Sequence, residues 1–205
     1  EGILAGYNVI GVDIDPLSAM ISKVKTTRVD ETELKRISSW LVKEIKAKKN
    51  GTFKPDCETI EHWFTKNAIK KLSAIRTLIN QIPEKFGDSK KIKDIQDLLL
   101  ICFSSIIRRV SNADNESQKT YVSHTKIKEP EEVNSLFFSQ LNLFVDRATI
   151  YSATINSKAK NKIIHSSSSA SLDKKLNGFQ IDLAITSPPY IKAIDYIYNQ
   201  MVELF

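Results

Sequence analysis

Through the middle of the chain, apolar side chains recur every three or four positions. This spacing is typical of a helix with one buried face. It predicts four successive helices, with expected bounds of Asp30 to Gly51, Ile60 to Pro83, Lys90 to Ser111 and Glu131 to Ile155. Together they would form a helical subdomain of four members.

Each predicted helix has its own apolar face. The positions expected to be buried are Leu34, Ile37, Leu41 and Ile45 in the first helix, Ile60, Phe64, Ala68, Leu72, Ile75, Ile79 and Ile82 in the second, Ile95, Leu98, Leu99, Cys102, Phe103, Ile106 and Val110 in the third, and Phe137, Leu141, Phe144, Ala148 and Tyr151 in the fourth. The third face is the widest, so we expect this helix to be the most buried.

The two ends of the chain carry short apolar runs bounded by turn residues, a pattern that predicts β-strands. The expected strands are Val9–Val12, Lys162–His165 and Leu183–Ile185. Gly6 stops a helical turn before the first strand, and Asp15 caps a helix that opens at Pro16. This alternation predicts an α/β fold in which residues 1–29 and 157–205 form a parallel sheet domain, interrupted by a helical insertion at 30–156.

The composition is that of an ordinary globular protein, with 41% hydrophobic and 26% charged residues. No apolar run is long enough for a membrane span and no signal peptide is evident, so we expect a cytoplasmic protein. The net charge of +6 is compatible with a polyanionic partner. Cys57 and Cys102 lack paired spacing and are expected to be reduced, and the scattered histidines predict no metal site.

The stretch Asp182–Tyr190 ends its predicted strand in a serine, two prolines and a tyrosine. Adjacent prolines stop a β-ladder and fix the backbone, and Pro188 keeps Ser187 out of helical dihedrals. The Ser187 hydroxyl and a rigid carbonyl could therefore each accept a hydrogen bond from an exocyclic amino group. These two bonds would turn the lone pair of its nitrogen towards an electrophile. The Tyr190 ring could stack on a base swung out of a helix.

Thr186–Tyr190 resembles motif IV of the S-adenosylmethionine-dependent DNA amino-methyltransferases. In that family the serine form is commonest among enzymes that methylate cytosine-N4. The resemblance implies that Ser187 and the Pro188 carbonyl hold the amino group and that Tyr190 stacks on the flipped base. Pro189 is the second of the two prolines that we expect to stiffen this tip. The expected fold is then a partial Rossmann-like methyltransferase sheet with a large inserted helical subdomain.

Gly11–Pro16 resembles motif II of the same family. The resemblance implies that Asp13 binds the ribose of S-adenosylmethionine and that Ile14 lies against its adenine. After the strand ending at His165, the family usually has a Gly-Asp pair, where this sequence has serines. Ser167 could accept a weaker hydrogen bond from the adenine, or the serines could form a connecting loop, which we slightly favour.

The Gly-rich loop that holds the methionine part of the cofactor in that family is not in this sequence. We therefore expect an internal fragment of a longer protein, which alone could be inactive. Arg108 and Arg109 close the third predicted helix, where cations are favoured by the helix dipole, and contacts to DNA are the alternative explanation. Lysines also cluster at 46–49, 66–71, 90–93 and 158–162, where we expect them to be mostly solvated, with some tracking a nucleic acid backbone.

The sequence therefore predicts an enzyme that transfers methyl from S-adenosylmethionine to cytosine-N4 or adenine-N6 in DNA. The insertion is a candidate for target recognition. Two alternatives stay open: a catalytically silent piece that binds DNA or forms a complex, and an RNA base methyltransferase. The target sequence and the oligomeric state cannot be read from the sequence.

Overall fold

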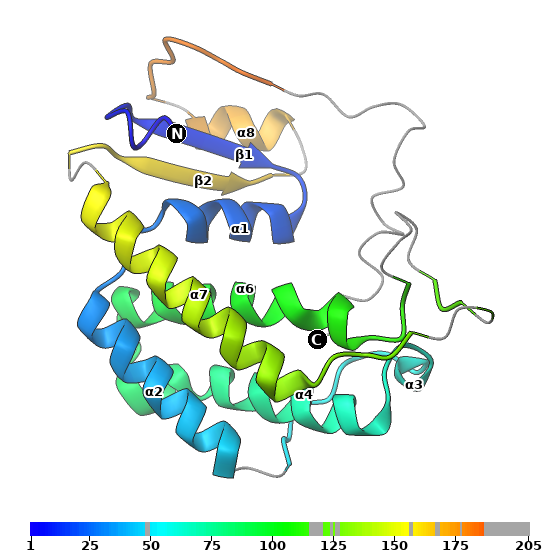
Figure 1. Ribbon diagram of the computed structural model, residues 1–205. Helices are drawn as coiled ribbons and strands as arrows, with labels where there is room; N and C mark the ends of the chain where they lie inside the picture. Colours follow the sequence, from blue (N-terminus) through cyan, green and yellow to red (C-terminus); the bar gives the residue numbers. More distant parts are fainter. Residues whose placement is uncertain are drawn as a thin grey trace. The chain divides into compact units, whose positions relative to one another are not determined.

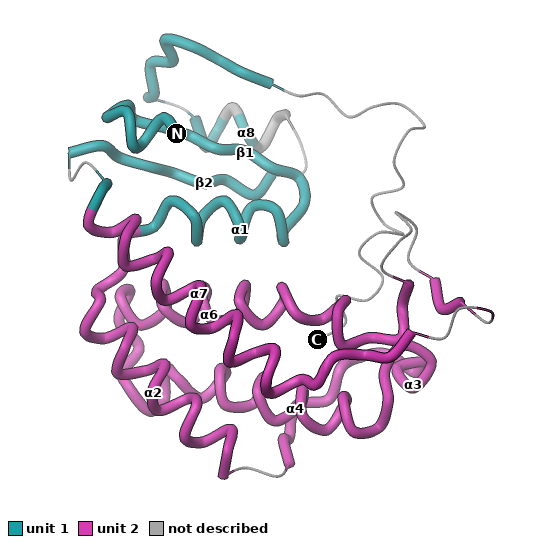
Figure 2. Tube along the Cα trace, viewed as in Figure 1, with its two compact units in different colours: residues 1–27, 154–195 teal, residues 28–153, 196–205 magenta. Residues whose placement is uncertain are grey.

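The computed structural model describes residues 1–47, 50–114, 121–123, 125, 128–155, 158–166, 169–176 and 178–186, the side chains of 169–171 and 173 excepted. These residues form two compact units (Figures 1 and 2). The first unit holds residues 1–27 and the described part of 154–186, and the second holds residues 28–153. The residues of the second unit therefore fall between the two segments of the first.

The first unit is built on two parallel strands, β1 (Val9–Asp13) and β2 (Asn161–His165). They pair in register from Val9 opposite Asn161 to Asp13 opposite His165. Helix α1 (Pro16–Thr26) packs against both strands, and Figure 1 shows α1 and α8 (Ser169–Leu176) on either side of the pair. The predicted α/β character and the first two strands are confirmed.

Local signals in the sequence set the ends of these elements. The Asp15 side chain accepts a hydrogen bond from the Ser18 amide at 2.7 Å, which caps α1, and Pro16 occupies its first turn. Gly6 ends the preceding turn with a φ of 88°, a conformation that favours glycine. Both predictions are confirmed.

The predicted strand Leu183–Ile185 is wrong for the described structure. Residues 183–186 form no strand, and the side chains of Leu183 and Ile185 are 75% and 88% exposed. A strand needs a neighbour to satisfy its backbone hydrogen bonds, and the sheet of the described residues consists of β1 and β2 alone. An apolar run by itself therefore does not fix a strand.

The second unit is helical (Figure 1). Its long helices are α2 (Glu31–Ala47), α4 (Lys66–Asn80), α6 (Lys90–Val110) and α7 (Val133–Thr154), and its short ones are α3 (Ile60–Trp63) and α5 (Ile82–Phe86). Their apolar faces meet in one core, whose fully buried side chains include Leu34, Ile37, Leu41, Phe64, Leu72, Ile75, Ile95, Leu99, Phe103 and Phe137. Helix α6 has the most buried residues of the described helices, as predicted.

The second predicted helix is in fact three helices. Phe64 is extended, and the Thr65 side chain accepts a hydrogen bond from the Ala68 amide at 3.2 Å, so α4 starts afresh there. Pro83 lies in the first turn of α5, where a missing N–H costs nothing, and so begins a helix rather than ending one. Both breaks leave the apolar residues on the core side, so the periodicity does not reveal them.

Helix α7 is buried along its first half. Phe137 and Leu141 are buried, whereas Phe144, Ala148 and Tyr151 are only partly buried, so the predicted face is confirmed in part. The loop after α2 is held closely against α4, where the Thr77 hydroxyl accepts hydrogen bonds of 2.9 Å from the amides of both Thr52 and Phe53.

Candidate active site

The carboxyl ends of β1 and β2 meet at one edge of the sheet, because parallel strands run in the same direction. Asp13 is the last residue of β1 and lies opposite His165, the last residue of β2. The Ser166 amide donates to the Asp13 carbonyl at 3.1 Å, so the pairing continues one step past β2. This edge is where ligands bind in open parallel sheets.

The Asp13 carboxylate is half-buried and has one oxygen engaged locally. Its Oδ1 accepts the Asp15 amide at 2.9 Å, which tightens the turn between β1 and α1. Its Oδ2 has no hydrogen-bond partner recorded among the described residues. That oxygen can accept a hydrogen bond from a ligand hydroxyl, as the sequence comparison with motif II predicts.

Ile14 follows Asp13 and presents an apolar surface beside the carboxylate. Its side chain is 67% exposed, which is unusual for an isoleucine in a compact unit. An acceptor oxygen next to an exposed apolar side chain suits a ligand that has both hydroxyl groups and a flat ring. The geometry is therefore compatible with a nucleoside.

His165 is a residue of this edge that the sequence reasoning did not assign. Its ring Nε2 lies 3.0 Å from the Ile14 carbonyl oxygen, so the ring reaches from the end of β2 to the residue after β1. His165 belongs to no metal-site spacing, so its place at the end of the second predicted strand is the only signal for it in the sequence. Aligning the ends of the first two predicted strands would have brought His165 to Asp13.

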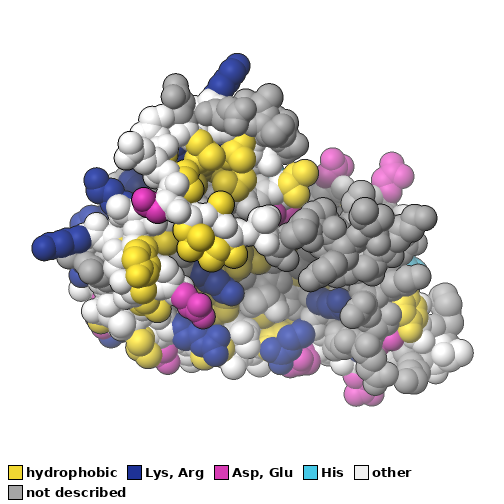
Figure 3. All heavy atoms as spheres, turned by 90° about the horizontal axis from the view of Figure 1, so that it is seen from above, with side chains coloured by type: hydrophobic (Ala, Val, Ile, Leu, Met, Phe, Trp, Pro, Cys, Tyr) yellow, Lys and Arg dark blue, Asp and Glu magenta, His cyan; other side chains and the backbone are white. Residues whose placement is uncertain are grey.

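The predicted catalytic residues Ser187, Pro188, Pro189 and Tyr190 lie outside the described residues, as does Ser167. Their roles stay predictions. The chain leading towards them is apolar and exposed, with Ile181 52%, Leu183 75% and Ile185 88% accessible. Figure 3 shows hydrophobic side chains gathered at the surface on the face seen from above.

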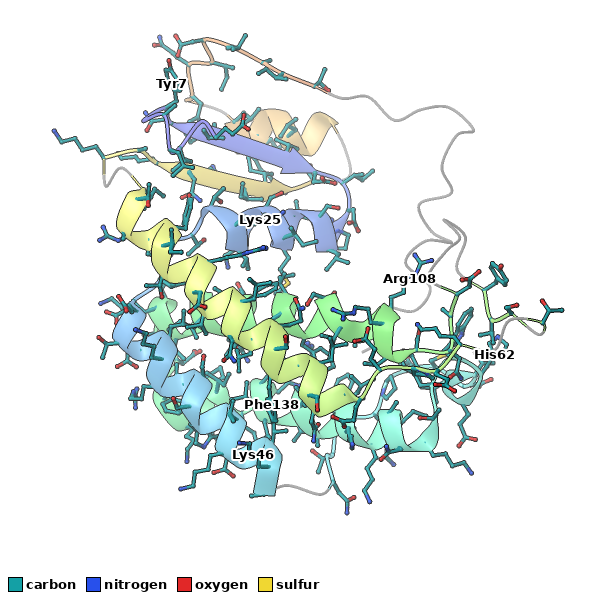
Figure 4. All side chains as sticks on the ribbon, viewed as in Figure 1. Tyr7, Lys25, Lys46, His62, Arg108 and Phe138 are labelled. Atoms are coloured by element: carbon teal, nitrogen blue, oxygen red, sulfur yellow. The ribbon has the colours of Figure 1, made fainter. Side chains whose placement is uncertain are left out.

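Arg108 and Arg109 lie at the end of α6 and make contacts within the second unit (Figure 4 labels Arg108). Arg109 holds Glu131 with two hydrogen bonds of 2.7 and 2.8 Å, and Arg108 donates to the Asp114 carbonyl at 3.0 Å. Guanidinium groups that already donate to protein acceptors have fewer N–H groups left to bind a phosphate. These contacts favour a structural role, and contact with DNA stays a prediction.

Lys128 completes this end of α6. Its ammonium donates to the carbonyls of Arg108 and Ala113, at 2.7 and 3.1 Å, so it satisfies one carbonyl in the last turn of α6 and one just after the helix. Burial, together with the charge of Arg108, lowers the pKa of Lys128 to about 8. Nearby, the Asn112 side chain donates a hydrogen bond of 3.1 Å to the carbonyl of His62, which ties this end of α6 to α3.

A cavity of about 630 Å³ lies in the second unit, between α2, α4 and α5. Its lining includes Trp40, Glu44, Glu84 and Lys85. None of the predicted site residues lines it, and its two carboxylates disfavour a phosphate.

The described residues contain no group of three or more His, Cys, Asp or Glu side chains that could hold a metal ion. Within the same residues, no helix combines the length and apolar character that a bilayer crossing demands.

A known protein is similar to most of this chain. The Type II methyltransferase M.MvaI of Kocuria varians is 28% identical to this chain over an alignment that covers 93% of the chain and 43% of the relative. The chain thus spans less than half the length of that protein. No family model matches the chain, and no solved structure matches it significantly. The resemblance to methyltransferases of this kind, predicted from the two motifs, is confirmed by this relative.

Proposed function

We propose that this chain is part of a DNA amino-methyltransferase, which moves a methyl group from S-adenosylmethionine to the N4 of cytosine or the N6 of adenine. The observation that carries the proposal is the match to a type II methyltransferase over 93% of the chain. The position of Asp13 and Ile14 at one sheet edge supports it. In this proposal β1 and β2 are two strands of a larger Rossmann-like sheet.

The residues at the edge fit one end of S-adenosylmethionine. The second oxygen of Asp13 would accept a ribose hydroxyl, and the exposed Ile14 side chain would lie against the adenine. Ser167 would accept a hydrogen bond from the adenine or serve as a connector. When bound, the donor supplies an electrophilic methyl group.

Ser187 and Tyr190 would act on the base. The exocyclic nitrogen is a poor nucleophile, because its lone pair is delocalised into the ring. The Ser187 hydroxyl and the Pro188 carbonyl would each accept a hydrogen bond from the amino group, which would direct its lone pair towards the methyl group. Tyr190 would stack on the flipped base and offset part of the cost of unstacking, which is a few kcal/mol. Positioning of the reactants is then the main catalytic contribution.

The second unit would contact the DNA around the target base. Lys43, Lys46, Lys66 and Lys70 are exposed on its surface. Lysines that neutralise phosphates release counterions, so DNA affinity would fall as salt is raised. Recognition of a defined sequence would serve a restriction–modification role, of the kind implied by a type II enzyme.

The test is methyl transfer by the complete gene product. The protein is incubated with labelled S-adenosylmethionine and unmethylated duplex DNA, and the digested nucleosides are separated by mass. N4-methylcytosine or N6-methyladenine is the expected product. The variants Ser187→Ala and Tyr190→Ala are expected to lose transfer while still binding the donor.

Other results would contradict the proposal. Binding of DNA without any labelled product would favour the silent DNA-binding alternative. Transfer to structured RNA that duplex DNA does not compete away would favour the RNA alternative. Full turnover in both variants would remove Ser187 and Tyr190 from the reaction.

A further inference from the structure

The ends of β1 and β2 are joined by two hydrogen bonds beyond the strand ladder. The Ser166 amide donates to the Asp13 carbonyl at 3.1 Å, and the His165 ring bonds the Ile14 carbonyl at 3.0 Å. The first is donated by a backbone amide, which any residue except proline could supply. The second depends on the histidine side chain, so it is a specific feature of this sequence.

The proton on this ring can be assigned from its partner. A carbonyl oxygen only accepts hydrogen bonds, so Nε2 must carry the hydrogen. This condition holds both for the neutral Nε2–H tautomer and for the imidazolium. The His165 ring is therefore a donor that fixes the backbone immediately after Asp13.

The backbone of His165 is itself anchored. The Lys175 ammonium in α8 donates to the His165 carbonyl at 2.8 Å, and Lys162 donates to the Lys175 carbonyl at 3.1 Å. The ring thus reaches Ile14 from a residue that is held by the strand on one side and by α8 on the other. A side chain on an anchored backbone restricts the Ile14 backbone more than a side chain on a mobile backbone would.

We infer that His165 is a positioning residue of the methyl-donor site, an inference that rests on the proposed function. Its ring holds the Ile14 carbonyl, so that the exposed Ile14 side chain and the neighbouring Asp13 carboxylate keep the arrangement that the donor nucleoside requires. A site fixed before binding loses less conformational entropy when the ligand arrives. The histidine therefore increases donor affinity without touching the reacting methyl group.

The experiment measures S-adenosylmethionine affinity by calorimetry on the complete gene product. His165→Ala removes the ring donor, and His165→Gln keeps an N–H at comparable reach. Asn161→Ala is the matched control, since Asn161 makes side-chain hydrogen bonds of 2.9 and 2.8 Å to Thr26 at the opposite end of β2. It tests the effect of weakening the strand away from the site.

We expect His165→Ala to weaken donor binding about three- to fivefold, in the lower part of the range for one net hydrogen bond, because the His165 ring is exposed to solvent. His165→Gln should restore binding to within about twofold of the parent, and Asn161→Ala should leave it unchanged. Unaltered binding in His165→Ala, or equal weakening in Asn161→Ala, would overturn the inference alone. A parent protein that binds no donor would instead overturn the proposed function.

A second measurement covers the case in which His165→Ala does not fold. Nitrogen-15 NMR of the parent protein reports which ring nitrogen of His165 carries hydrogen. A proton on Nε2 is expected. A neutral ring protonated only at Nδ1 would refute the tether, because that nitrogen arrangement cannot donate to the Ile14 carbonyl.

Discussion

Replacing Asp13 with asparagine separates the charge of the carboxylate from its role in the turn. The Asp13 Oδ1 accepts the Asp15 amide at 2.9 Å, and an asparagine keeps an oxygen for this bond. The other carboxylate oxygen becomes an amide nitrogen, which donates and cannot accept a ribose hydroxyl. The fold should therefore be preserved while the proposed donor contact is lost.

The size of the effect follows from the kind of hydrogen bond removed. Hydrogen bonds to charged groups contribute about 1.5–3 kcal/mol, equivalent to about ten- to hundredfold in a dissociation constant. Asp13 is only half-buried, so solvent weakens the contact and we expect about ten- to thirtyfold. Asp13→Ala should weaken the binding of S-adenosylmethionine further, because it also removes the hydrogen bond to the Asp15 amide in the turn.

The assay is calorimetric titration of the complete gene product with S-adenosylmethionine, with thermal melting as a check on folding. Asp15→Asn is the matched control, because it removes a charge two residues away and keeps an oxygen to cap α1. The control should bind the donor as the parent does. Equal donor affinity in the parent and Asp13→Asn would mean that the ribose is held elsewhere.

Three further predictions concern the second unit. Gly51→Ala should destabilise it by about 1–3 kcal/mol and lower the melting temperature, because a Cβ there would lie 2.2 Å from the backbone of α4. Burial raises the pKa of the Cys102 thiol to about 12, so Cys102 should resist an aromatic disulfide reagent until the unit unfolds, whereas the half-buried Cys57 reacts. Although burial raises the pKa of Glu132, its hydrogen bonds lower it to about 2 overall. Its stabilising contribution, about 0.5–1 kcal/mol at this exposed site, should be lost as the pH falls from about 4.5 to 2, and Glu132→Gln should flatten that part of the stability curve. A pH profile unchanged by Glu132→Gln, early labelling of Cys102, or an unaffected melting temperature in Gly51→Ala would each refute its own prediction.

The helical unit could be predicted well from the sequence, because burial on one side of a helix leaves a direct periodic record. Leu34, Ile37 and Leu41 lie four or fewer positions apart and are all fully buried. The break at Thr65 and the break between Asn80 and Ile82 do not show in the pattern for the same reason, since the apolar spacing continues across both. The predicted stop at Pro83 falls instead in the first turn of α5. Thr65 as an N-cap and Pro83 as a first-turn residue are the sequence signals that locate the starts of α4 and α5.

The sheet was harder to predict, because pairing joins residues far apart in the sequence. The apolar runs locate the carboxyl ends of the first two strands. The end of the first strand marks Asp13 and Ile14 as candidate site residues. A run such as Leu183–Ile185 does not say which strand it would pair with. His165 was missed because its partner is a backbone carbonyl, and no side-chain motif reports such a contact.

A crystal structure of the complete gene product with S-adenosylmethionine and target DNA tests the central claim most directly. We predict that the ribose hydroxyls bind the Asp13 carboxylate, that the adenine lies on Ile14, and that the Ser187 hydroxyl and the Tyr190 ring hold a flipped base beside the sulfonium methyl group. A donor bound away from Asp13, or a Tyr190 ring packed in a hydrophobic interior far from that carboxylate, would contradict the account.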